Sequence, residues 1–316
     1  MEEKVSMKSM RRTLAPMSRT LLVYFLMMNL VVLLVDGLDA SFRILWGREP
    51  ISFSEALQDA MATNYWGYLV CIAIGLAIVL GWKGSAFWRQ EIWKTNREMT
   101  LVTFLLLGSW LYAMQMVFGY LNAGLERVLE QWGASSQTAL ESATALSLSP
   151  SMFLYACVAG PIAEELLFRG LILRSFLPYG KKFAVAASAL LFGFYHGNPV
   201  QTPVTFAVGL IFGYAAVEYN IGWAMVLHMG NNLLLCDTLV RVLGHMHPLL
   251  AGLLEAGIAL SLLLCWIVTT LIKRRGILTW LRREKMNWRA MGALFQCPST
   301  IVLVCITVGC MVLLVL

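Results

Sequence analysis

Apolar segments, each long enough to cross a bilayer, recur along almost the whole chain. A helix that spans the hydrocarbon core needs about 20 mostly apolar residues. The pattern predicts nine such helices, near residues 20–38, 65–82, 99–121, 149–172, 183–198, 203–218, 223–240, 249–272 and 299–316. Because the fifth to seventh segments are short and closely spaced, a count of eight spans is the alternative. The predicted fold is therefore all-α: a polytopic transmembrane helical bundle with about eight to nine spanning helices.

Two polar segments interrupt this pattern. Residues 122–148 are polar and acidic, which fits either an amphipathic helix at the membrane surface or a loop. Residues 276–295 mix tryptophans with arginines, which fits an interfacial helix or a solvated loop equally well.

Composition supports the membrane class. Hydrophobic residues make up 59% of the 316 residues and charged residues 13%, whereas soluble proteins carry about 25% charged residues. The net charge of +6 is concentrated in the N-terminal tail and near residues 83–97, 174–182 and 273–289. Residues 39–64 and 122–148 are poor in basic side chains.

Basic residues therefore alternate between successive loops, which sets membrane orientation rather than indicating a nucleic-acid partner. The sequence predicts an integral membrane protein whose partner is the lipid bilayer, with the N-terminus in the cytoplasm and the C-terminus outside. A simple bundle without extra domains favours a bacterial plasma membrane. No nucleic-acid partner is expected.

The densest cluster of charge within an apolar segment contains Glu164, Glu165 and Arg169. Charges inside membrane helices are costly, so each is a candidate functional residue. Glu165 and Arg169 are four residues apart and can pair on one helix face. Glu164 lies about 100° around the helix and is free to face a cavity. The alternative is a purely structural Glu–Arg pair.

Histidine and asparagine complete the candidate site. His196 follows Phe192 by four residues in one apolar segment, and His228 precedes Asn232 by four residues in another. A lone histidine in an apolar helix is usually a hydrogen-bonded structural residue. Two histidines on separate helices, with a carboxylate pair on a third, favour a catalytic site.

These groups suit hydrolysis of a peptide bond by water. A glutamate and a histidine can deprotonate water, while a second histidine and an asparagine amide can donate hydrogen bonds to the oxyanion. Glu164, His196 and His228 could instead hold Zn²⁺ and leave one position for water. The spacing alone leaves the zinc-assisted and metal-free mechanisms both open.

The motifs Glu164-Glu165-x-x-x-Arg169, Phe192-x-x-x-His196 and His228-x-x-x-Asn232 resemble those of the CPBP intramembrane proteases. That family includes type II CAAX prenyl endopeptidases and bacteriocin-processing or immunity proteins. The resemblance covers roughly residues 150–240.

The resemblance implies a helical membrane bundle that cleaves peptide bonds with the six motif residues. Glu164 and His196 would activate water, and His228 and Asn232 would bind the oxyanion. The expected substrate is a membrane-associated peptide or a membrane-tethered protein. On this interpretation residues 149–240 form the catalytic core, flanked by N-terminal helices (1–148) and C-terminal helices (241–316).

Two other functions are consistent with the same residues. The chain could be a non-catalytic immunity or partner-stabilising protein that retains the motif. It could also be a proton-coupled transporter, although the sequence shows no inverted repeat. One feature opposes the protease hypothesis: the predicted helix ends place Glu164 and His196 at different depths, so at least one helix must be tilted or displaced, or its ends shifted by a turn.

Overall fold

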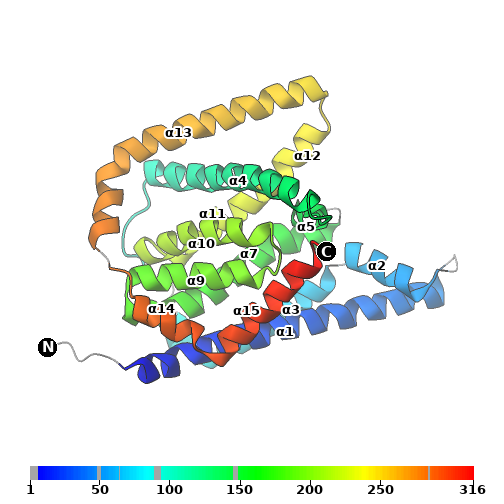
Figure 1. Cartoon of the computed structure of the whole chain (residues 1–316), viewed down its shortest axis with the longest axis horizontal. Coiled ribbons are helices and arrows are strands. Elements are labelled where there is room, and N and C mark those ends of the chain that lie inside the picture. Colours follow the sequence, from blue (N-terminus) through cyan, green and yellow to red (C-terminus); the bar gives the residue numbers. More distant parts are fainter. Residues whose placement is uncertain (1–5, 48–50, 64, 89–93, 145–148, 284) are drawn as a thin grey trace.

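The computed structural model describes residues 6–47, 51–63, 65–88, 94–144, 149–283 and 285–316 (Figure 1). The regular elements in these ranges are all helical. The longest helices are α1 (Met7–Trp46), α3 (Trp66–Phe87), α4 (Leu101–Glu130) and α13 (Pro248–Arg283). Shorter helices are α2 (Phe53–Thr63), α5 (Gln137–Thr144), α9 (Lys181–Tyr195), α10 (Gln201–Glu218), α11 (Ile221–Gly230), α12 (Leu239–Gly244), α14 (Trp288–Phe295) and α15 (Pro298–Leu313).

Helices of mixed type form the segment that carries Glu164. The order is α6 (Pro150–Phe153), π-helix η2 (Leu154–Ala159), α7 (Gly160–Glu165), π-helix η3 (Leu166–Leu173), α8 (Arg174–Phe176) and 3-10 helix η4 (Leu177–Tyr179). A third π-helix, η5 (Asn231–Thr238), joins α11 to α12. π-Helical turns are rare and often lie at functional sites. In this chain each of the three adjoins a predicted catalytic motif.

The all-α prediction is confirmed, but the predicted count of eight to nine spans is not shown. Within the described residues, α1, α4 and α13 are long and apolar enough to cross a membrane, and two bent helix pairs could raise the count to five. The central helices are shorter, with 15 residues in α9 and 10 in α11. π-Helical segments divide two of the apolar runs into shorter helices.

In Figure 1, α13 and α4 lie on one side of the molecule and α1 on the other, with α7, α9, α10 and α11 between them. Across the molecule α13 packs on α4, α4 on α10, and α10 on α9 and α11. On the other side α1 packs against α3, α14 and α15. Large apolar side chains stay exposed on the outer helices, including Leu253 and Leu271 on α13. Such a surface is suited to lipid, and these helices indicate an integral membrane protein.

Glycines bring α9 and α10 into close contact. A Cβ atom at Gly193 would lie 2.9 Å from the carbonyl oxygen of Thr202, and one at Gly209 would lie 3.3 Å from the Cα of Ala189. Small residues permit such close approach of helix backbones. Gly197 has a different role. It follows the C-cap residue of α9 and has a φ of +59°. A left-handed glycine there terminates the helix after the His196 motif.

Candidate active site

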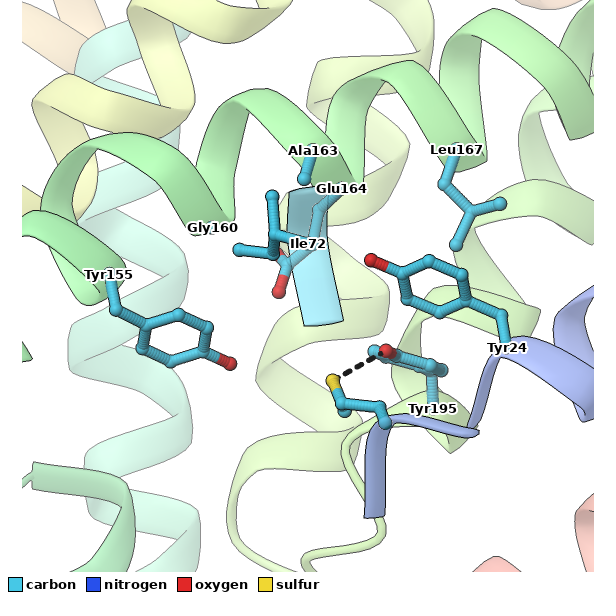
Figure 2. Close-up of a pocket in the computed structure, with 9 residues that line it drawn as sticks. Tyr24, Ile72, Tyr155, Gly160, Ala163, Glu164, Leu167 and Tyr195 are labelled. Carbon is cyan, nitrogen blue, oxygen red and sulfur yellow. Dashed lines mark hydrogen bonds between the residues drawn. The ribbon is translucent and has the colours of Figure 1, made fainter. Parts of the chain in front are cut away.

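Glu164 and Glu165 are adjacent in α7 but lie in different environments. The Glu165 side chain is fully buried, whereas 21% of the Glu164 side chain is exposed. Glu164 lines a cavity between α1, α3, α7 and α9 (Figure 2). Rotation of about 100° between successive helical residues produces this separation. The sequence-based expectation that Glu164 faces a cavity agrees with this geometry.

Arg169 is the buried partner of Glu165. Its Nη1 donates to Oε1 of Glu165 at 3.0 Å, which confirms the predicted pair. Its Nη2 donates to the carbonyl oxygen of Gly209 at 3.1 Å, and its guanidinium carbon lies 4.4 Å from the ring centre of Phe192. Gly209 permits this contact, since a Cβ there would lie 3.1 Å from Nη2. Arg169 therefore links η3 to α10 and fixes the Glu165 carboxylate.

His228 lies between the two carboxylates. Its Nδ1 is 2.9 Å from Oε1 of Glu165, and its Nε2 is 3.7 Å from Oε2 of Glu164. A carboxylate oxygen accepts, so Nδ1 carries the proton and donates it to Glu165. The ring also stacks on Phe212, with centroids 4.6 Å apart. The imidazole is thus held on one edge and one face, and Nε2 points towards Glu164.

His196 is oriented by its own helix. Its Nδ1 lies 2.8 Å from the carbonyl oxygen of Phe192, which can only accept, so Nδ1 is the donor. The Phe192 ring contacts both imidazoles, at centroid distances of 4.8 Å to His196 and 5.8 Å to His228. In the neutral ring Nε2 therefore keeps a lone pair that can accept a proton.

The observed helix ends reduce the predicted difference in depth between Glu164 and His196. The helical run that contains Glu164 continues to Phe176 rather than ending near residue 172. At 1.5 Å per residue, Glu164 lies about 18 Å before that end. His196 lies roughly 22 Å beyond Lys181, where α9 begins after the turn. The two segments form an antiparallel pair, so both residues lie at a similar distance from the turn.

Asn232 joins the first helix of the site to the last. Its Nδ2 donates to the carbonyl oxygen of Ala156 in η2 at 2.9 Å, and its Oδ1 accepts from Asn231 at 3.1 Å. An amide nitrogen has two hydrogens. One N–H therefore holds η2 in place, and the other has no partner among the described residues.

A catalytic zinc ion takes three protein ligands and leaves one position for water. Both imidazoles donate Nδ1 to an oxygen, the arrangement that orients histidine ligands in metal sites. Within the described ranges, however, no three His, Cys, Asp or Glu side chains gather closely enough to hold an ion. Glu164, His196 and His228 thus do not form a three-ligand site in this geometry, and zinc binding stays a prediction.

Sequence reasoning missed the aromatic part of the site. Tyr24, Tyr155 and Tyr195 line the cavity beside Glu164 (Figure 2). Phe212 and Gly209, which support His228 and Arg169, were also not assigned to the site. Tyrosines within apolar segments were the available signal, since a buried phenol needs a polar partner.

The comparisons with known proteins agree with the motifs. Residues 146–234 match the family model described as "Type II CAAX prenyl endopeptidase Rce1-like". No curated protein and no solved structure gave a match. The matched segment contains all six motif residues, and membership of this family suggests a membrane protease. Residues 146–234 of this integral membrane protein therefore form a domain of the Rce1-like type II CAAX prenyl endopeptidase (CPBP) family.

Proposed function

We propose that the protein is a membrane-embedded endopeptidase that hydrolyses a peptide bond in a membrane-associated peptide or protein. The observation that carries the proposal is the placement of His228 between Glu165, which is buried and paired, and Glu164, which faces the cavity. One carboxylate is thereby committed to structure and the other is left available for chemistry.

Glu164 and His196 activate water in this proposal. Either Glu164 or the Nε2 of His196 removes a proton from a water molecule, and the hydroxide attacks the scissile carbonyl carbon. The tetrahedral intermediate then collapses, the C–N bond breaks, and the proton passes to the leaving amine. Peptide hydrolysis thus balances with one water consumed and no redox change.

His228 and Asn232 stabilise the oxyanion that forms during the attack. Asn232 offers its second N–H. Because Nδ1 of His228 already donates to Glu165, this residue donates to the oxyanion only when Nε2 also carries a proton. Donors aimed at developing charge in a site of low dielectric constant contribute strongly to catalysis.

Glu165 and Arg169 are positioning residues in this proposal. They touch His228 and the α10 backbone rather than the cavity that would hold the substrate. Their contribution is to fix the imidazole of His228 in one orientation.

The test uses the purified full chain in proteoliposomes and a mixed peptide library analysed by mass spectrometry. We expect cleavage by the wild-type protein, and loss of at least about 100-fold with Glu164→Gln or His196→Ala, the range for removal of a general base. Glu130→Gln is the matched control, because Glu130 is exposed at the end of α4. Cleavage at the wild-type rate by Glu164→Gln would contradict the proposal.

A complementation assay separates this proposal from the non-catalytic alternative. An immunity or partner-stabilising protein would still complement a deletion strain when Glu164 is replaced by glutamine. An endopeptidase would not.

A further inference from the structure

A path of amide side chains leads from α4 to the candidate oxyanion group. Nε2 of Gln115, in α4, donates to Oδ1 of Asn231 at 3.3 Å. Nδ2 of Asn231 donates to Oδ1 of Asn232 at 3.1 Å, and Nδ2 of Asn232 donates to the carbonyl oxygen of Ala156 at 2.9 Å. These bonds join α4, η5 and η2 into one continuous network.

The carbonyl end of this path fixes the direction of each bond in it. A backbone carbonyl oxygen can only accept, so Asn232 must turn its NH2 group towards Ala156. Its Oδ1 then faces Asn231, which must present its own NH2 group there. The Oδ1 of Asn231 is thereby turned towards Gln115, which donates to it. Rotating any one of these amides by 180° would set like groups against each other.

The orientation of Asn232 matters for chemistry because one end of an amide donates and the other accepts. A rotated Asn232 would present an oxygen where the oxyanion needs an N–H. Donors that are already aimed at the developing charge need no reorganisation during the reaction. Whatever holds this amide in one orientation therefore supports catalysis.

Asn231 is placed to act through its neighbour. It is buried, with 6% of the residue exposed, whereas Asn232 is half-buried. Successive residues of a helix point in different directions, so Asn231 faces α4 while Asn232 faces η2. Asn231 is thus a positioning residue rather than a catalytic one.

The path begins outside the family-matched segment. The match covers residues 146–234, whereas Gln115 lies midway along α4, a helix long and apolar enough to cross a membrane. Polar side chains in such helices often bond across to a neighbouring helix, which by itself is a packing role. A second bond of this kind runs from Nε1 of Trp110 to Oγ1 of Thr270 at 3.3 Å. It joins α4 to α13 rather than to η5, so it provides a matched control.

We propose that Gln115 and Asn231 orient the Asn232 amide so that its second N–H is directed at the oxyanion. This inference rests on the proposed endopeptidase function and adds two positioning residues to its oxyanion site. It also gives α4 a part in catalysis that the matched segment does not contain.

The test separates kcat from KM for the library peptide that the wild-type protein cleaves fastest in proteoliposomes. Asn231→Leu keeps the approximate size of the side chain and removes the donor to Asn232. We expect kcat to fall about tenfold, the equivalent of about 1.4 kcal/mol, and KM to change less than about twofold. Gln115→Met acts one bond further away and should lower kcat about threefold. Thr270→Val should leave both constants unchanged.

A double-mutant cycle separates positioning from a purely structural role. In an Asn232→Ala background no amide is left to orient, so Asn231→Leu should cause no further loss in single-turnover assays. If Asn231→Leu does not fold, Gln115→Met tests the same path.

Several outcomes would overturn the inference: an unchanged kcat in Asn231→Leu or Gln115→Met, a loss that falls on KM, an equal loss in Thr270→Val, or a further loss of the same size in the Asn232→Ala background. Failure of the proposed function has a different signature, namely cleavage that survives Glu164→Gln or no cleavage by the wild-type protein.

Discussion

The Nδ1 atom of His228 donates to Oε1 of Glu165 across 2.9 Å, and the same carboxylate oxygen accepts from Arg169. This bond connects residues that are 63 positions apart in the chain. It gives the second glutamate of the motif two partners, of which the i,i+4 spacing indicated only the arginine. The orientation of the imidazole at the site thus depends on a buried ion pair.

Glu164 and Glu165 should respond differently to the same substitution. Glu165→Gln removes the charge that compensates buried Arg169, so we expect about 3 kcal/mol of destabilisation. Glu164→Gln should change stability little, because this side chain is partly exposed, and should abolish activity. Equilibrium unfolding in mixed micelles, measured beside the cleavage rate, separates the two. Similar stability losses in both variants would contradict this assignment.

Gly209→Ala should destabilise the site through contact with Arg169. The new methyl would lie 3.1 Å from Nη2 of Arg169 and 3.2 Å from Cδ1 of Phe192. Overpacking of this kind costs about 1–3 kcal/mol. Gly119→Ala in α4 is the control, because nothing lies within 4 Å of its built Cβ. Thermal unfolding of the two purified variants provides the measurement, and equal midpoints would argue against the tight contact.

Asn232→Asp should reduce kcat with little change in KM. The aspartate keeps the size of the side chain but removes both amide hydrogens, one of which is expected to bind the oxyanion. Loss of one such donor costs about 100-fold to 1000-fold in kcat. Asn122→Asp is the matched control, since Oδ1 of Asn122 accepts a bond from Ser136 that aspartate preserves. An unchanged kcat for Asn232→Asp would remove Asn232 from the oxyanion site.

Metal analysis decides between the two mechanisms that the spacing left open. Since the described His, Cys, Asp and Glu residues gather no three-donor cluster, we expect substoichiometric zinc and activity that survives chelation. The measurement is elemental analysis of the purified protein, with cleavage assayed before and after dialysis against a chelator. One zinc per chain together with loss of activity on chelation would refute this expectation.

The sequence alone determined that the chain is helical and apolar. It also predicted one candidate site, formed by Glu164, Glu165, Arg169, His196, His228 and Asn232. Charged residues are rare within apolar helices because their burial is costly, so those present can be found from the sequence. The four-residue spacing predicts the Glu165–Arg169 pair, because residues i and i+4 share one face of a helix. These features depend on residues close together in the chain.

Only the tertiary structure decided which partners meet across helices. Three contacts join separate segments of the chain: the hydrogen bond from His228 to Glu165, the packing of the Tyr24 ring on Gly75, and the packing of Arg169 on Gly209. The hydrophobic periodicity of the sequence does not predict any of them. The position of Glu164 relative to His196 also depended on where their helices end. Hydropathy reports how apolar a segment is, whereas packing between helices decides where it ends and what it faces.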